Sequence, residues 1–206
     1  VTALICTKPL CVPELDKQSA AVLTNFNGGM FGGLALAEVI FGEINPSGKL
    51  PISFPHHVGQ QPCYYNQLPG WHCRSYADMP ADPLYSFGHG LSYTSFAYSD
   101  MKFDEKTLTL RVSVQNTGKL CGTETVQVYF RDLVSSVITP EKLLIAFCKV
   151  QLKAGEKKEI QFTFTREDFS FVNALEQRVT EPGEFEIMVG GSSDDGDLTV
   201  KKFTVK

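Results

Sequence analysis

The chain of 206 residues has few cysteines and no excess of positive charge. Its six cysteines never form a C-x-x-C pair, which excludes the common zinc and thioredoxin-like motifs. The net charge of -4 argues against a nucleic-acid partner, because phosphate binding requires concentrated Lys and Arg. No apolar run approaches the roughly 18 residues of a membrane-spanning helix. These absences predict a globular protein with neither a nucleic-acid nor a membrane partner.

The placement of the cysteines leaves two alternatives open. Cys63 and Cys73 flank one loop, so a disulfide between them is one interpretation. The other is that the thiols are reduced, because the density of cysteine is far below that of disulfide scaffolds. Reduced thiols favour a cytoplasmic location, and a secreted or periplasmic one is left open.

Recognisable catalytic and ligand-binding motifs are also absent. The four histidines show no metal-ligand spacing with each other or with the cysteines. The glycine cluster at 28–33 lacks the dinucleotide fingerprint, since Asn27 occupies its first position. There is no G-x-S-x-G motif, and no two carboxylates are paired by sequence alone. We therefore expect no metal, no cofactor and no catalytic residue in this chain.

The first half reads as part of an α/β layer. Residues 2–6 and 20–26 are short apolar runs typical of buried strands, and 49–54 resembles a third. Residues 30–41 predict a helix with almost no polar face, which must lie between other layers. So few elements cannot cover both faces of a parallel sheet. We expect residues 1–95 to be the last part of an α/β sandwich, incomplete alone, whose earlier strands precede Val1 in a longer protein or another chain.

The second half reads as an all-β domain. Apolar and polar residues alternate at 108–115, 126–130, 160–164 and 185–189. A further strand is predicted at 144–152, with Leu144 and Cys148 together on its buried apolar face. Turn residues separate these runs. About seven short strands over 96–206 predict an immunoglobulin-like or fibronectin type III sandwich. The lack of a Cys…Trp…Cys framework favours the fibronectin type.

A loop at 56–82 and an apolar segment at 83–96 join the two halves. The loop is long enough to be functional or fixed on a neighbouring domain. Its aromatic and polar side chains suit a carbohydrate rim, but they also suit a structural role in which the aromatics hold the loop in place, and we favour the second. The 83–96 segment is expected to be structural, with Leu91 buried. The candidate substrate-binding residues are Tyr64, Tyr65, Asn66, Trp71 and His72.

Four runs, taken in order, carry a resemblance to a known family. They are GGLALAEVIFGEINPSGKLPISFP at 32–55, PCYYNQLPGWH at 62–72, PLYSFGHGLSYTSF at 83–96 and EPGEFEIMVGGSS at 181–193. Together they resemble the C-terminal portion of glycoside hydrolase family 3, which holds β-glucosidases and β-xylosidases, and the fibronectin type III-like domain that many members carry. Cys63 and Cys73 depart from the pattern, which has an aliphatic and a small residue there.

The resemblance implies the C-terminal part of a retaining exo-β-glycosidase that acts on terminal glucosyl or xylosyl residues. The aspartate nucleophile and the probable glutamate acid/base would both precede Val1, so this chain alone would be inactive. Its partners would be a β-glycoside or oligosaccharide substrate and the upstream barrel and α/β segments, with a homo-oligomer left open. The alternative is a non-catalytic carbohydrate-binding or adhesion module.

Overall fold

A small parallel sheet opens the chain. The computed structural model describes residues 1–70 and 76–206. Strand β1 (Thr2–Leu4) pairs in parallel with β2 (Val22–Thr24), and α1 (Pro13–Gln18) lies between them in sequence. Both strands fall inside the apolar runs that predicted them.

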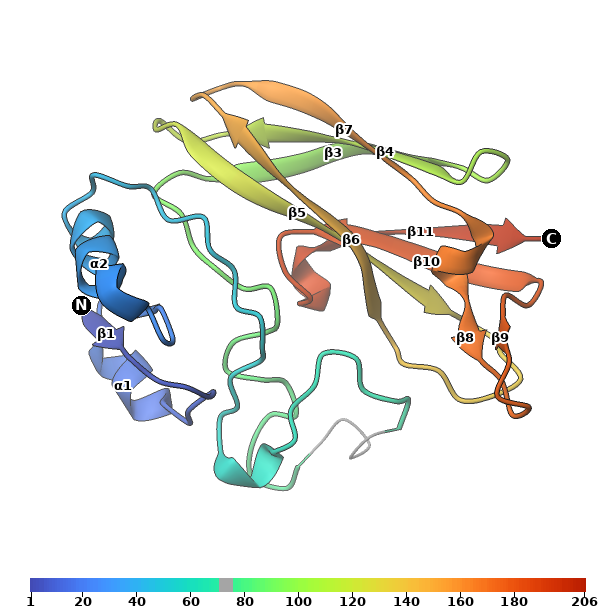
Figure 1. Cartoon of the computed structure of the whole chain (residues 1–206), viewed down its shortest axis with the longest axis horizontal. Coiled ribbons are helices and arrows are strands. Elements are labelled where there is room, and N and C mark those ends of the chain that lie inside the picture. The colour runs from blue at the N-terminus through green and yellow to red at the C-terminus, as the bar shows by residue number, and fades with distance from the viewer. Residues whose placement is uncertain (71–75) are drawn as a thin grey trace.

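An apolar helix follows this sheet. The 3-10 turn η1 (Gly29–Phe31) leads into α2 (Gly32–Ile40), close to the predicted helix at 30–41. Of the side chains in and around α2, Phe31 is 66% exposed and Phe41 is 82% exposed. The elements β1, α1 and α2 lie together beside the sandwich (Figure 1), and the rest of this chain leaves the Phe31 and Phe41 side chains largely uncovered. No helix within the described residues is long and apolar enough to cross a membrane.

The strand expected at 49–54 is not formed, and that prediction was wrong. Only one bridge occurs there, between Phe54 and Tyr85, with their backbone N–H and C=O groups exchanging bonds of 2.8 and 3.2 Å. Pro51 and Pro55 have no backbone N–H to donate, which prevents a longer ladder. Phe54 is nevertheless 1% exposed, and its ring packs edge to face on that of Tyr85 in the 83–96 segment. The turn η2 (Val58–Gln60) then starts the long loop.

Two antiparallel sheets form the second half (Figure 1). The four-stranded sheet has the order β11-β10-β5-β6, and the three-stranded sheet has the order β3-β4-β7. A short hairpin of β8 (Phe171–Val172) and β9 (Arg178–Val179) lies at one end. The sandwich strands are β3 (Phe96–Asp104), β4 (Thr109–Asn116), β5 (Gly122–Asp132), β6 (Leu143–Leu152), β7 (Lys157–Thr163), β10 (Gly183–Gly190) and β11 (Leu198–Val205).

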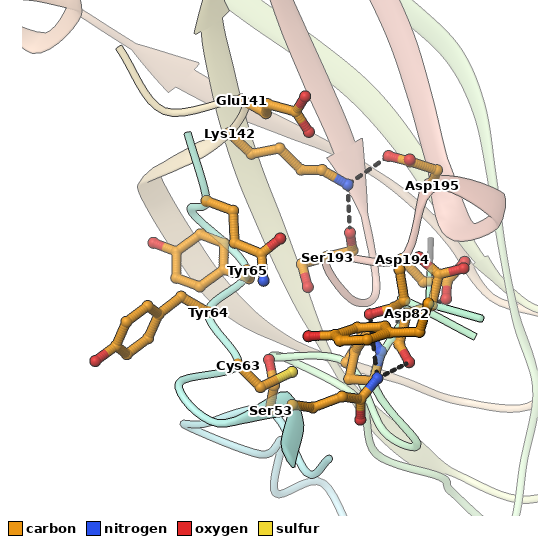
Figure 2. A pocket seen from close by; sticks show the side chains of 16 residues that line it. Ser53, Cys63, Tyr64, Tyr65, Asp82, Glu141, Lys142, Ser193, Asp194 and Asp195 are labelled. Atoms are coloured by element: carbon orange, nitrogen blue, oxygen red, sulfur yellow. Dashed lines mark hydrogen bonds and ion pairs between the residues drawn. The ribbon is translucent and has the colours of Figure 1, made fainter. Parts of the chain in front are cut away.

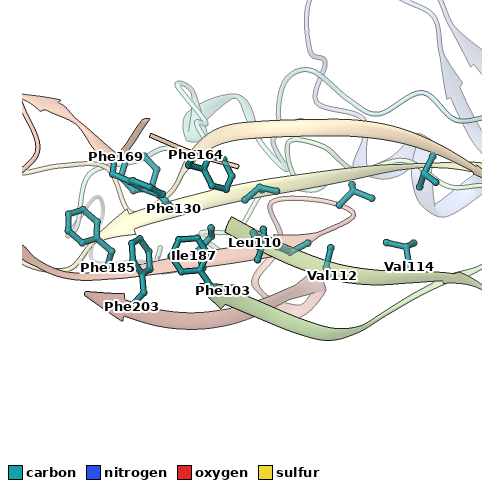
Figure 3. Close-up of a cluster of buried hydrophobic side chains, with 14 of the residues drawn as sticks. Phe103, Leu110, Val112, Val114, Phe130, Phe164, Phe169, Phe185, Ile187 and Phe203 are labelled. Atoms are coloured by element: carbon teal, nitrogen blue, oxygen red, sulfur yellow. The ribbon is translucent and has the colours of Figure 1, made fainter. Parts of the chain in front are cut away.

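Phenylalanine rings fill one end of the space between the sheets (Figure 3). At their centre is Phe169, which is fully buried at the end of the turn η4 (Arg166–Phe169). Its ring centroid lies 5.2–6.5 Å from those of five others, and all five pairs are edge to face, a geometry that aromatic pairs prefer. The five partners are Phe103, Phe130, Phe164, Phe185 and Phe203.

A bulge changes which side chains of β6 face this core. The pairing of β5 with β6 shifts where Val128 is opposite Ala146 and Tyr129 is opposite Leu144. A one-residue shift moves side chains to the other face of a sheet. Ile145 therefore packs against the core, and the expectation that Leu144 does so was wrong. Cys148 lies beyond the bulge and packs against the core as expected.

We predict that Phe169→Ala lowers the free energy of unfolding by about 3–5 kcal/mol, because truncating a fully buried aromatic leaves a cavity. Urea denaturation followed by circular dichroism measures the change. Leu175→Ala is the matched control, since Leu175 is 76% exposed and should change stability by less than about 0.5 kcal/mol. Equal effects of the two substitutions would contradict the assignment of Phe169 to the centre of the core.

Candidate functional site

A buried ion pair joins the N-terminal part to the sandwich. Lys49 Nζ lies 3.4 Å from Glu124 Oε1, and the two side chains are only 15% and 6% exposed. Lys49 also donates to Gly90 O at 2.9 Å, and the Tyr98 hydroxyl donates to Glu124 at 2.9 Å. Burial raises the pKa of Glu124, and the neighbouring Lys49 charge opposes that rise. The pair therefore depends on both halves being in contact.

The 83–96 segment is fixed on the outer face of β5 by one amide. Gln127 Nε2 donates to Gly88 O at 3.1 Å and to Gly191 O at 2.5 Å. The Tyr129 hydroxyl donates to Gln127 Oε1 at 2.6 Å. Gly88 has a φ of 79°, and a Cβ there would lie 2.1 Å from Gln127 Oε1, so only glycine fits. Leu91, in the same segment, is 76% exposed, and the expectation that it is buried was wrong.

A cavity of about 200 Å³ lies between the long loop and one end of the sandwich. Its polar side chains come mainly from the loop, from the two residues just before β6 and from the turn η5 (Asp195–Asp197) with the residues before it (Figure 2). The lining residues are Ser53, Gln60, Cys63, Tyr64, Tyr65, Gln67, Tyr76, Ala81, Asp82, Pro83, Ser86, Glu141, Lys142, Ser193, Asp194 and Asp195.

One wall of the cavity is organised by Lys142. Its ammonium donates to Ser193 O at 2.7 Å and pairs with the Asp195 carboxylate (Figure 2). The Lys142 side chain is 13% exposed, so this charge is largely withdrawn from solvent. The neighbouring Asp194 accepts from Gly196 N at 2.9 Å and so caps the turn η5. These two aspartates therefore have structural partners within the turn.

Tyr65 attaches the long loop to the sandwich. Its ring stacks on Phe87 at a centroid distance of 4.2 Å and meets Tyr129 edge to face at 5.9 Å. Its hydroxyl accepts from Leu144 N at 3.3 Å. The ring is thus occupied by protein contacts, as expected for the structural role that the sequence analysis favoured.

The other candidate residues are placed differently. Tyr64 lines the cavity with 59% of its surface exposed, and in Figure 2 its ring points away from Lys142 and Asp195. Asn66 is half-buried and does not line the cavity. Trp71 and His72 lie outside the described residues.

Cys63 has a free thiol that lines the cavity. Burial raises the pKa of this thiol, and the nearby Asp82 carboxylate raises it further. Its expected partner in the disulfide alternative, Cys73, lies outside the described residues. Among residues 1–70 and 76–206, no group of three or more His, Cys, Asp or Glu side chains could hold a metal ion.

Comparison with known proteins assigns both halves. Residues 1–93 match the glycosyl hydrolase family 3 C-terminal domain, and residues 124–193 match the fibronectin type III-like domain. The chain belongs to glycoside hydrolase family 3. The two matches follow one another in the order that the sequence runs predicted.

Relatives of this family 3 chain align along nearly all of it. A periplasmic beta-glucosidase of Salmonella typhimurium is 40% identical over 94% of the chain, and a beta-xylosidase of Formosa agariphila is 40% identical over all of it. The chain spans 27% and 30% of their lengths. Among solved structures, a β-glucosidase from Erythrobacter marinus is 40% identical with a TM-score of 0.91, over 99% of this chain and 28% of that one. A Listeria innocua beta-glucosidase in complex with glucose is 37% identical with a TM-score of 0.89, over 98% and 30%.

We predict that Tyr65→Ala costs about 3 kcal/mol of stability and exposes the 56–82 loop to proteolysis, because it removes the stack on Phe87. Tyr65→Phe is the matched control. It keeps the ring and loses only the hydroxyl that accepts from Leu144 N, so it should cost about 1 kcal/mol. Urea denaturation and limited trypsin digestion make the two measurements. A Tyr65→Ala loop that resists trypsin as the wild type does would contradict the attachment.

His89 gives a prediction for pH dependence. Burial lowers its pKa, and so does Lys49, while Asp197 and Asp194 act in the opposite direction. The folded chain thus binds this proton more weakly than the unfolded chain. The contribution of neutral His89 to the free energy of unfolding is fully present above the pKa of histidine in the unfolded chain, about 6.5. This contribution is lost as the pH falls below that value.

We therefore expect His89→Gln to lose less stability than the wild type between pH 6.5 and 5.5, measured by urea denaturation at each pH. His57→Gln is the control, because His57 is exposed. Parallel curves for the wild type and His89→Gln would show that His89 does not contribute to the acid loss.

Proposed function

We propose that this chain is the C-terminal portion of a retaining exo-β-glycosidase that hydrolyses terminal β-linked glucosyl or xylosyl residues. The observation that carries the proposal is the pair of family matches, at 1–93 and 124–193, in a chain whose relatives include beta-glucosidases and beta-xylosidases. Relatives this similar along the whole chain support a shared role for this portion in each protein.

The catalytic carboxylates of this enzyme are proposed to lie before Val1. A retaining glycosidase needs a nucleophile and an acid/base about 5 Å apart on either side of the scissile bond. Within the cavity, Asp195 is paired with Lys142, and Asp194 accepts from Gly196 N and from Ser86 Oγ. Both aspartates are already engaged in structural contacts, Asp195 in the ion pair and Asp194 in the turn. This engagement supports a non-catalytic role for this end of the sandwich.

The upstream barrel and α/β segments are proposed as the main partner. Besides Phe31 and Phe41, the side chains of Ile5 and Met30 are 75% and 90% exposed in the same part of the chain. Several large apolar side chains left exposed in one part of a soluble protein indicate an interaction site. We propose that residues 1–95 complete an α/β sandwich there and that 96–206 form the fibronectin type III-like domain.

A second candidate function is a non-catalytic carbohydrate-binding or adhesion module. The exposed Tyr64 ring beside a polar cavity favours it, because aromatic faces stack on sugar rings while polar groups bind the hydroxyls. This candidate needs no upstream segment for its activity, so the two functions make different predictions.

We predict that the chain alone does not hydrolyse p-nitrophenyl β-glucoside or β-xyloside, and that activity appears when it is produced together with the upstream segment. Release of p-nitrophenol measures activity, and calorimetric titration with laminaritriose measures binding. The upstream segment without this chain is the control. Hydrolysis by the chain alone would contradict the proposal, and trisaccharide binding without hydrolysis in any combination would support the second candidate.

A further inference from the structure

We infer that the cavity between the long loop and the sandwich binds one neutral sugar ring of an oligosaccharide substrate. This inference rests on the proposed function, since it assigns a substrate subsite to a glycosidase. Apart from Tyr64, it names residues that no sequence motif indicates. The groups that carry it are Gln67, Asp82, Lys142 and Tyr64.

Two of these groups have no side-chain partner among the described residues. The side-chain amide of Gln67 and the carboxylate of Asp82 both line the cavity, and neither forms a hydrogen bond with another described residue. An amide offers both donors and an acceptor, whereas a carboxylate offers acceptors alone. Sugar hydroxyls both donate and accept, so this combination matches adjacent hydroxyls on one ring.

Lys142 supplies a further donor to the cavity. An ammonium has three N–H groups, and two of them are directed to Ser193 O and to Asp195. The third remains for a ligand oxygen. Because Asp195 already balances the charge of Lys142, the site does not favour an anion. The absence of a metal-holding cluster in the described part of the chain argues against a divalent cation.

Tyr64 and the size of the cavity define how a ligand enters. Pockets for drug-sized ligands measure roughly 300–1,000 Å³, so a cavity of about 200 Å³ suits a single ring. Tyr64 lies at the rim, and its hydroxyl forms no hydrogen bond with a described residue. The ring is thus available to stack on the next sugar of a chain that extends out of the cavity.

The test uses the full-length protein with variants Tyr64→Ala, Gln67→Leu and Asp82→Ala. Each should raise the KM for laminaritriose or xylotriose about fivefold more than the KM for the p-nitrophenyl glycoside, the factor expected for one lost hydrogen bond or ring contact. Asp82→Asn, which keeps an acceptor oxygen, should recover part of the loss. Leu175→Ala, an exposed truncation on the β8–β9 hairpin, should leave both KM values unchanged.

Other outcomes separate the inference from the proposed function. The variants must first melt at the same temperature as the wild type. If both KM values then change equally, or do not change, the sugar site is overturned and the proposed glycosidase function is unaffected. If the wild type hydrolyses no β-glycoside, the proposed function fails. In that case calorimetric titration with the same trisaccharides decides the site. Binding weakened about fivefold by Tyr64→Ala supports it, and no binding to the wild type overturns it.

Discussion

The contact between the 83–96 segment and the outer face of β5 determines how the two halves sit together. Gln127, which is 3% exposed, has both of its amide atoms in hydrogen bonds, and one of those bonds requires the left-handed backbone of Gly88. A buried amide without partners would cost roughly 1–3 kcal/mol, so the segment has one favourable position on the sheet. The ion pair of Lys49 with Glu124 and the stack of Tyr65 on Phe87 both depend on that position.

Much of the fold could be predicted from local patterns. The alternation of apolar residues predicted the sandwich strands, because a half-buried strand has a period of two. It could not predict the bulge in β6, because the register depends on the partner strand. As a result of this bulge, Ile145 packs against the core in place of the expected Leu144. Nor could it indicate Phe169, which belongs to no strand and reaches the core through a turn with a capping box.

The site was less accessible from the sequence than the fold. The aromatic pair at 64–65 indicated the loop that lines the cavity, but only tertiary contacts distinguish the stacked Tyr65 from the exposed Tyr64. Lys142 meets Gln67 and Asp82 of the 56–82 loop in one cavity, and no two of these residues are close in sequence, so no local motif connects them. The Ser-Ser-Asp-Asp-Gly run at 192–196 was the one available signal, since such runs form turns.

The attachment of the long loop has a consequence for how this part of the protein diverges. Tyr65 contacts one ring from the 83–96 segment and another, Tyr129, from β5. A change of ring size at any of the three positions would leave a gap or a clash for the other two. Evolution should therefore alter them as a group, and the loop can acquire new ligands only at neighbouring positions that escape this shared constraint.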